Sequence, residues 1–225
     1  MTKKKDNALN VFVLLDRSGS MSGPRWESAI GGINTYIHQL RKENVKANIT
    51  VAAFDSFNDN GNIFNNASFG QRSNSGLAFE VLRDNLDLEV YKDIDSKETC
   101  PRGGTPLYDA TGVLLNLADK ANGEKTVILI MTDGDENQSK TYNLTSIKDR
   151  IATCTNRGWE VVFLGAEFNA DNMTQSLGLS MEKTMSTTTR GFAPAMTAYA
   201  TSSASYALTN APINTTEMKK NIPGL

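Results

Sequence analysis

Short runs of aliphatic residues alternate along this chain with segments of helical periodicity, and this alternation restricts the fold more than any other feature. Residues 11–15 and 126–131 are continuous apolar runs, the pattern of strands that are buried on both faces of a sheet. After the first run, Gly23 and Pro24 open a segment whose apolar residues recur every three or four positions, as on one face of a helix. Strands that alternate with helices predict a parallel α/β sheet.

The same two patterns predict the remaining elements. Further strands are expected at residues 48–57, 78–83 and 159–164, with an edge strand at 183–186. Helices after the first are expected at residues 106–121, 144–157 and 191–208, with a short one at 169–177. Two glycines inside the first helix, Gly31 and Gly32, are unfavourable there by about 1 kcal/mol each, so we expect that helix to approach the sheet closely.

One domain is expected from the length of 225 residues, because a chain with 39% hydrophobic residues can close one sizeable core. We assign residues 8–208 to that domain and residues 1–7, which hold three lysines, to a solubilising N-terminal tail. Residues 209–225 lose the helical periodicity and hold two prolines. We therefore expect a C-terminal extension outside the core.

An inserted segment at residues 57–77 is rich in asparagine, glycine and serine, yet it also carries five large apolar residues. A flexible spacer rarely holds so many, since leaving each one in water forfeits about 1.5–3 kcal/mol relative to burial. Two interpretations stay open. The segment is either a hairpin folded onto the domain's own sheet edge or a second contact surface that selects a partner.

Charge and hydropathy exclude several classes of partner. With 23 basic and 25 acidic residues the net charge is −2, which gives no broad attraction to nucleic acid or to an anionic membrane. No apolar stretch approaches the roughly 20 residues that cross a bilayer, and the run at 11–15 is shorter than the roughly 7–15 residues of a signal peptide core. We expect a cytoplasmic chain without a secretory signal, in which Cys100 and Cys154 are free thiols.

Oxygen-bearing side chains lie where the apolar runs end. Asp16, Ser18 and Ser20 follow the first run, Asp133 follows the run at 126–131, and Thr105 stands just ahead of an expected helix. The carboxyl ends of parallel strands meet at one edge of a sheet, so these five side chains are expected to converge there. Two carboxylates and three hydroxyls without histidine or cysteine suit Mg²⁺, Mn²⁺ or Ca²⁺ rather than zinc.

Each residue of this set also has an ordinary structural interpretation. Ser18 and Ser20 could cap and turn the chain, Thr105 could cap its helix, and Asp133 with Gly134 could form a simple turn. Each of these interpretations is the better one for a single residue. The occurrence of all five at the strand ends of one sheet favours the metal site.

Three motifs in this chain resemble, in order and spacing, the metal-ion-dependent adhesion site of von Willebrand factor type A (vWA) domains. They are Asp-Arg-Ser-Gly-Ser-Met at residues 16–21, Gly-Thr-Pro-Leu-Tyr-Asp-Ala at 104–110 and Thr-Asp-Gly at 132–134. The likeness covers residues 8–208 and is closest to the compact stand-alone forms of bacteria and their phages. It implies a doubly wound, mostly parallel sheet with one antiparallel edge strand and helices on both faces.

The resemblance also implies a role for each site residue. Ser18, Ser20 and Thr105 would bind the metal directly, and Asp16 and Asp133 would act largely through water. Hydroxyl ligands leave much of the charge of Mg²⁺ unneutralised, so a Glu or Asp of a partner protein can complete its coordination. The function implied is a metal-dependent protein-binding module. An alternative is a structural or accessory component of a larger assembly such as a phage particle, in which case the chain would be located in the virion.

An enzyme is the competing class, and we expect that this chain is not one. Asp16 resembles the aspartate nucleophile of haloacid-dehalogenase-like phosphatases, but the second aspartate that they need two positions on is Ser18 here. The sequence has no Gly-Lys-Ser/Thr phosphate loop and no Gly-x-Ser-x-Gly elbow, and its single histidine, His38, is remote from every candidate nucleophile. We expect Asp135 and Glu136 to form a solvated acidic rim. A metal-dependent, phosphatase-like hydrolase is the remaining alternative.

Overall fold

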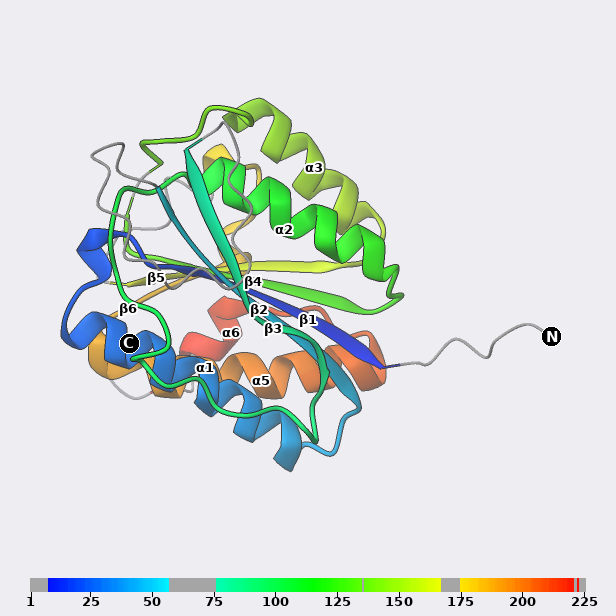
Figure 1. The fold of residues 1–225 in the computed structure, drawn as a ribbon. Helices are drawn as coiled ribbons and strands as arrows, with labels where there is room; N and C mark the ends of the chain where they lie inside the picture. The colour runs from blue at the N-terminus through cyan, green and yellow to red at the C-terminus, as the bar shows by residue number, and fades with distance from the viewer. Residues whose placement is uncertain (1–7, 57–75, 135, 167–174, 221, 223–225) are drawn as a thin grey trace.

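The computed structural model describes residues 8–56, 76–134, 136–166, 175–220 and 222. Within these residues one six-stranded sheet has the order β3-β2-β1-β4-β5-β6 (Figure 1). Its strands are β1 (Leu9–Asp16), β2 (Ala47–Ser56), β3 (Leu77–Asp87), β4 (Thr126–Thr132), β5 (Glu160–Ala166) and β6 (Thr184–Thr187). Every neighbouring pair is parallel except β2 and β3. The predicted mostly parallel sheet with one antiparallel edge strand is confirmed.

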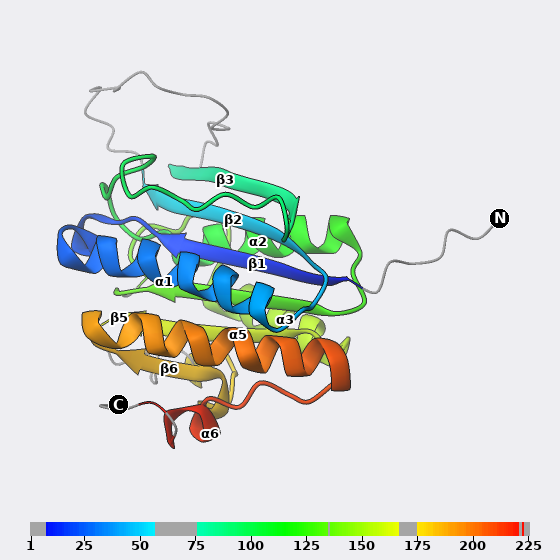
Figure 2. The same ribbon diagram turned by 90° about the horizontal axis from the view of Figure 1, so that it is seen from below.

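Helices cover both faces of this sheet. The longer ones are α1 (Pro24–Lys42), α2 (Leu107–Ala121), α3 (Leu144–Asn156) and α5 (Phe192–Thr209), and α6 (Thr215–Lys220) is short. Figures 1 and 2 show α2 and α3 on one face and α1 and α5 on the other, with α6 near the β6 end of the sheet. Each long helix confirms a predicted one, and the bounds of α2, α3 and α5 differ from those predicted by one residue at most. None of the helices among the described residues combines the length and apolar character of a membrane span.

The core consists of two clusters, one on each face of the sheet. Successive side chains of a strand point to opposite faces, so Val11, Val13 and Leu15 of β1 join the cluster under α1 and α5. Phe12 and Leu14 join the cluster under α2 and α3. This is why the run at the start of the chain is apolar at every position. Cys154 is buried in the second cluster, and both cysteines are free.

The close approach expected at Gly31 and Gly32 is between two helices and not between helix and sheet. A β-carbon on Gly32 would lie 3.2 Å from Met196 Cγ and 3.5 Å from Phe192 Cδ1, both on α5. Nothing lies within 4 Å of the corresponding position on Gly31, which is exposed. Gly32 therefore allows α1 and α5 to pack closely side by side on one face of the sheet.

The expectation that residues after 208 lie outside the core is wrong for the described part of that segment. Ile213, Met218 and Ile222 are buried in the cluster under α1 and α5. The Thr215 hydroxyl, which is also buried, donates a 2.6 Å hydrogen bond to the Thr184 carbonyl at the start of β6. The apolar residues of this segment are too few and too widely spaced to give a periodic pattern, so the sequence did not indicate their burial.

Several predicted segments lie outside the described residues. These are the N-terminal tail at 1–7, the inserted segment at 57–77 up to residue 75, and the first part of the short helix expected at 169–177. Leu77, the last residue of the inserted segment as predicted, is the first residue of β3. The strand expected at 78–83 is therefore longer than predicted at both ends.

Candidate metal centre

The parallel pairing of β1 with β4 places the two apolar runs side by side, and Leu15 lies opposite Met131. The next residue of each strand is polar. Thr132 Oγ1 donates a 2.7 Å hydrogen bond to Asp16 Oδ2, and the Ser18 N–H donates a 2.7 Å bond to Asp16 Oδ1. Burial raises the pKa of Asp16 to about 6; these hydrogen bonds oppose the rise and the nearby charge of Asp133 adds to it. Keeping the buried Asp16 carboxyl ionised therefore costs free energy unless a cation lies close to it.

The two serine hydroxyls lie next to each other just beyond β1. Ser18 Oγ and Ser20 Oγ are 3.0 Å apart, and Ser20 Oγ donates a 2.7 Å hydrogen bond to Asp133 Oδ1. A 3-10 turn, η1 (Gly19–Met21), brings them together, and Ser18 is its N-cap residue without a capping bond from its side chain. The Ser18 hydroxyl therefore does not cap this turn, which was the alternative interpretation of this residue.

Thr105 reaches the same place from the start of α2. A β-carbon on Gly134 would lie 3.7 Å from Thr105 Oγ1 and 3.9 Å from Ser20 Oγ, so both hydroxyls face the loop that follows β4. The N-cap residue of α2 is Pro106 and not Thr105. All five residues that the sequence singled out are thus brought together at the carboxyl ends of β1 and β4. We call Asp16, Ser18, Ser20, Thr105 and Asp133 the hydroxyl–carboxylate cluster.

Backbone contacts with the end of β2 hold the loop that carries Thr105. The Ser56 N–H donates to the Gly104 carbonyl at 3.1 Å, and the Gly104 N–H donates to Ser56 Oγ at 2.7 Å. Gly103 has a φ of +65°, and a β-carbon there would lie 2.2 Å from the Ser56 carbonyl oxygen. Only glycine permits this close approach. The Gly19 N–H also donates to the Gly103 carbonyl at 3.1 Å, which joins this loop to η1.

The loop after β4 caps the N-terminus of α2 with three side chains. Backbone N–H groups of Thr105, Tyr108 and Asp109 donate, in that order, to Asn137 Oδ1, Glu136 Oε2 and Ser139 Oγ at 2.9, 2.9 and 3.0 Å. The expectation that Glu136 belongs to a solvated acidic rim is therefore wrong, because its carboxylate satisfies backbone donors of a helix end. Asp135, the other residue of that expected rim, lies outside the described residues.

Asp109 of α2 also binds the loop that follows β4. Its buried carboxylate accepts hydrogen bonds from three consecutive backbone N–H groups, those of Lys140, Thr141 and Tyr142, at 3.0, 2.9 and 2.7 Å. We call Asp109, Glu136, Asn137 and Ser139 the α2 clasp. The clasp fixes Thr105 relative to the loop that begins with Asp133, and it uses side chains outside the cluster to do so.

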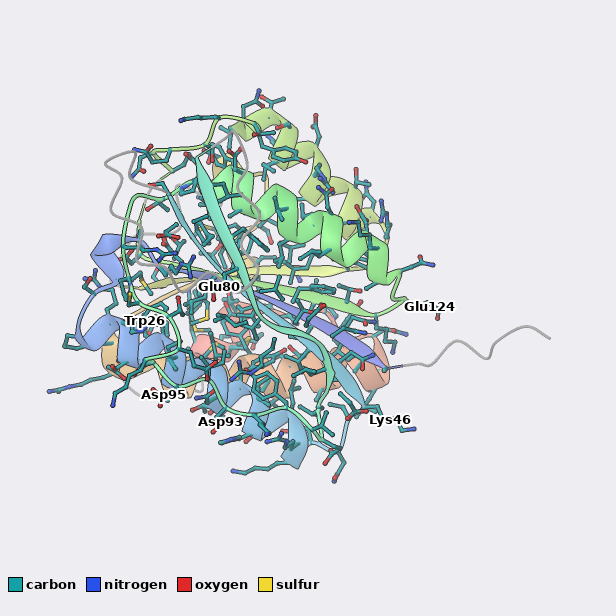
Figure 3. The ribbon with its side chains drawn as sticks, viewed as in Figure 1. Trp26, Lys46, Glu80, Asp93, Asp95 and Glu124 are labelled. Atoms are coloured by element: carbon teal, nitrogen blue, oxygen red, sulfur yellow. The ribbon has the colours of Figure 1, made fainter. Side chains whose placement is uncertain are left out.

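Arg17, between two cluster residues in the sequence, points away from the cluster into a buried ionic network. Its side chain is 2% exposed and donates to Asp55 Oδ1 at 3.0 Å, to Thr99 Oγ1 at 2.7 Å and to the carboxylate of Glu80. Glu80 is labelled on β3 in Figure 3. Arg102 also donates to Asp55, at 2.7 Å. Burial raises the pKa of Asp55, and the two arginines oppose that rise.

One cation of the chain itself contacts the cluster. Arg25, the second residue of α1, donates from Nη1 to Asp133 Oδ2 at 2.5 Å and to the Ser20 carbonyl at 2.8 Å. The next residue, Trp26, donates from Nε1 to the Ser96 carbonyl at 2.9 Å and is labelled at this end of α1 in Figure 3. Arg25 therefore lies on a fixed part of the helix.

A family model agrees with the observed fold. The model of the von Willebrand factor type A domain matches residues 10–199. The chain belongs to this family. None of the curated proteins matches this vWA domain in sequence.

Solved structures of similar fold come from several sources. A von Willebrand factor type A protein from Catenulispora acidiphila has a TM-score of 0.61 at 14% identity, over 88% of this chain and 42% of that one. The PilB minor pilin of Streptococcus sanguinis has a TM-score of 0.62 at 11% identity, over 94% and 64% of the two chains. The pilus adhesin SpaC of Lactobacillus rhamnosus GG has a TM-score of 0.60 at 15% identity, over 92% and 31%.

These similarities establish the fold alone, because identity is low. The chain also spans less than two-thirds of each of the three proteins, with 64% as the largest share. Beyond the fold, the vWA domain has to be interpreted from its own residues.

Titratable residues elsewhere in the described part of the chain do not form another candidate metal centre. The side chains of His38 and Asp93 are 2.9 Å apart and about half exposed, His38 on α1 and Asp93 on the loop that follows β3. Across the described ranges, no group of three or more histidine, cysteine, aspartate or glutamate residues could hold a metal ion. The hydroxyl–carboxylate cluster is of another kind, because only two of its five side chains are carboxylates and the other three are hydroxyls.

Sequence reasoning missed Arg25, Thr132 and the α2 clasp. Thr132 belongs to a motif that was recognised, so its contact with Asp16 could have been inferred from the pairing of β1 with β4. Arg25 carried no signal, because an arginine in the first turn of a surface helix is usually solvated. The clasp joins residues far apart in the sequence, and no local pattern reveals such contacts.

Proposed function

We propose that this vWA domain binds a divalent cation at the hydroxyl–carboxylate cluster and that the cation bridges to an acidic residue of a partner protein. The observation that supports this most is the convergence of the Ser18, Ser20 and Thr105 hydroxyls beside two buried carboxylates. By the family resemblance, these hydroxyls would bind the cation directly, and Asp16 and Asp133 would act through water. Mg²⁺ is the expected cation, with Mn²⁺ and Ca²⁺ as alternatives.

The chemistry of the cluster fits such a cation. Two neighbouring oxygens of an octahedral Mg²⁺ shell lie about 3 Å apart, given metal–oxygen distances of about 2.1 Å. The 3.0 Å separation of Ser18 Oγ and Ser20 Oγ agrees with that value. Two carboxylates match the two charges of the ion, and a cation beside Asp16 would compensate the cost of burying its charge. When bound, the cation would supply an open coordination position for an anionic oxygen.

We propose binding rather than turnover as the activity of this site. Ser18 stands where a phosphatase of the haloacid dehalogenase type has its second aspartate. The nearby carboxylates Asp109 and Glu136 each accept hydrogen bonds from three backbone N–H groups, so they are poorly placed to move protons for a substrate. Among the described residues, His38 is too exposed and too far along α1 to serve as a general base for the cluster.

A protein partner also accords with the similar structures, two of which are a minor pilin and a pilus adhesin. These names describe proteins of assembly and adhesion, and we extend only that general role to this chain. The second candidate function is a structural or accessory component of a larger assembly, in which the compact vWA domain docks with or without a cation. A metal-dependent, phosphatase-like hydrolase is a third, less favoured alternative.

Capture of a partner from the native host would test the proposal. The immobilised domain should retain a specific protein in the presence of Mg²⁺ and release it in EDTA. Thr105→Ala, which removes one hydroxyl and leaves both carboxylates, should fail to retain that protein even with Mg²⁺. If the unmodified domain and Thr105→Ala both retain that protein in EDTA, docking without a cation is favoured.

Incubation with aryl phosphates, esters and nucleotides in Mg²⁺ or Mn²⁺ separates binding from hydrolysis. We expect these substrates to survive unchanged. Hydrolysis above background that is lost in Asp133→Asn would overturn the proposal in favour of the hydrolase.

A further inference from the structure

Arg25 occupies an unusual place for a cationic side chain, because it contacts a residue that is expected to serve a metal cation. Its Nη1 lies 2.5 Å from Asp133 Oδ2 and 2.8 Å from the Ser20 carbonyl oxygen. The other oxygen of Asp133 accepts from Ser20 Oγ at 2.7 Å. Both oxygens of this carboxylate are therefore bound within the chain, one of them by a full positive charge.

The burial of the two partners makes this ion pair stronger than one on an open surface. The Asp133 side chain is fully buried, and that of Arg25 is 27% exposed. Solvent screens a charge-assisted hydrogen bond in such a place only in part. Arg25 also lies in the first turn of α1, where Trp26 fixes the helix to the loop that contains Ser96, so the guanidinium is held beside the cluster.

The charges of the site explain what Arg25 would do. The Arg25 guanidinium contacts Asp133, one of the two carboxylates that would face the cation. A divalent cation at the cluster would therefore lie close to the positive charge of Arg25. Like charges a few ångströms apart repel each other, and an anion that approaches both is attracted by both.

We propose that Arg25 makes retention of the cation depend on an anionic partner. It weakens binding of the cation alone, and it strengthens binding of a carboxylate to the cation-loaded site. The partner class that fits is a protein segment with an exposed acidic residue, which would meet the cation and the Arg25 charge together. This inference rests on the proposed function, since it concerns the cation at the same cluster.

Calorimetric titration of the protein with Mn²⁺ alone would test the first half of the inference. Arg25→Gln removes the charge, Arg25→Lys keeps it, and Arg25→Met is a second neutral variant with a long side chain. Lys42→Gln is the matched control, because it removes one positive charge from an exposed position at the far end of α1. Metal-free melting curves establish that each variant is folded.

We expect both neutral Arg25 variants to bind Mn²⁺ about tenfold more tightly than the unmodified protein at low ionic strength. The difference should shrink as salt is added, because salt screens the repulsion. Lys42→Gln and Arg25→Lys should stay within about twofold of the unmodified protein, since the first charge is distant and the second is retained.

Acetate, a small carboxylate, tests whether Arg25 strengthens binding of a carboxylate to the cation-loaded site. The Mn²⁺ titrations are repeated in sodium acetate and in sodium chloride of equal ionic strength, so that weak complexation of free Mn²⁺ by acetate affects all proteins equally. Acetate should improve Mn²⁺ binding to the unmodified protein and to Lys42→Gln several-fold more than binding to Arg25→Gln. An equal effect of acetate on all three would overturn the dependence on an anion.

The results that would overturn this inference differ from those that would overturn the proposed function. Equal or weaker Mn²⁺ binding by the neutral Arg25 variants, with clear binding by the unmodified protein, overturns this inference and leaves the metal site standing. In that case Arg25 only positions Asp133. Absence of Mn²⁺ binding in the unmodified protein and in every variant overturns the proposed function and this inference together. Binding by the neutral variants alone would support the inference in its strongest form.

Discussion

Two buried aspartates at the same edge of the sheet are used in opposite ways. Asp109, in the α2 clasp, accepts hydrogen bonds from three consecutive backbone N–H groups. Asp16, in the hydroxyl–carboxylate cluster, accepts from one backbone N–H and from the Thr132 hydroxyl. Burial dominates at Asp16 and raises its pKa to about 6. The first carboxylate stabilises a loop, and the second has capacity to interact with a further positive charge.

The difference indicates how the site is prepared. Rigid loops are needed to place three hydroxyls within reach of one point, and this rigidity comes from the clasp, from Ser56 and from the Arg17 network. The side chains of the cluster therefore do not have to cap the N-terminus of α2. The groups that hold the loops and the groups of the cluster are separate in this molecule, and a preorganised site of the kind we propose needs this arrangement.

The largest effect on stability is expected from loss of the clasp. Asp109→Ala leaves three backbone N–H groups without their acceptor, so we expect the free energy of unfolding to fall by about 3 kcal/mol or more, measured by urea denaturation. Asp119→Ala is the control on the same helix, where the side chain is 36% exposed and pairs with Arg150 and Arg157. Each of these two exposed ion pairs is worth about 1 kcal/mol or less. Equal losses in the two variants would show that the clasp is no more than a surface interaction.

Asp16 should make the cation-free protein less stable as the pH rises. Between its ordinary pKa of 3.8 and the raised value of about 6, the folded chain binds a proton that the unfolded chain releases. The stabilising contribution of this group is therefore complete below 3.8 and is lost as the pH rises through about 6. We expect a loss of about 3 kcal/mol across that window, measured by denaturation in EDTA at several pH values.

Asp16→Asn, which cannot ionise, separates this effect from that of other groups. Its stability should depend less on pH over the same window than that of the unmodified protein. Identical pH profiles for the two proteins would mean that Asp16 does not carry the buried charge. Saturating Mg²⁺ should oppose the loss at high pH, because a proton and a cation compete for the same carboxylate.

The smallest effects are expected from the hydroxyls of the cluster. Without added cation, Ser20→Ala and Thr105→Ala should each lower the free energy of unfolding by about 1 kcal/mol or less. Ser20 loses one hydrogen bond to Asp133, and the backbone of Thr105, which joins the clasp, is unchanged. A loss as large as that of Asp109→Ala would assign these hydroxyls to the scaffold and remove the contrast between the two regions.

The sequence predicted the parts of this molecule that follow from local pattern. Continuous apolar runs identified β1 and β4, and their order in a parallel sheet was enough to bring Asp16, Ser18 and Asp133 together. Periodicity likewise identified α1, and it gave the bounds of α2, α3 and α5 to within one residue. These features are determined by which faces of an element are buried, and that information is written in the spacing of its apolar residues.

Contacts between side chains and distant backbone could not be predicted in this way. Glu136 was interpreted as solvated because an acidic residue after a turn usually is, whereas here it accepts from the N–H of Tyr108 in the first turn of α2, 28 residues earlier. Ile213 was assigned to an extension because a single apolar residue between polar ones has no period. Arg25 was overlooked for a related reason, since its position beside Asp133 depends on where α1 begins in space.

Thermal unfolding with and without divalent cation tests the central claim, that the hydroxyl–carboxylate cluster binds a cation. Mg²⁺ or Mn²⁺ at a hundredfold excess over Kd should stabilise the unmodified protein by about 2.7 kcal/mol, because a ligand that binds only the folded state adds RT ln(1 + [L]/Kd). Asp16→Ala and Thr105→Ala should abolish the rise in melting temperature. A rise that persists undiminished in both variants would place the cation elsewhere and contradict the account.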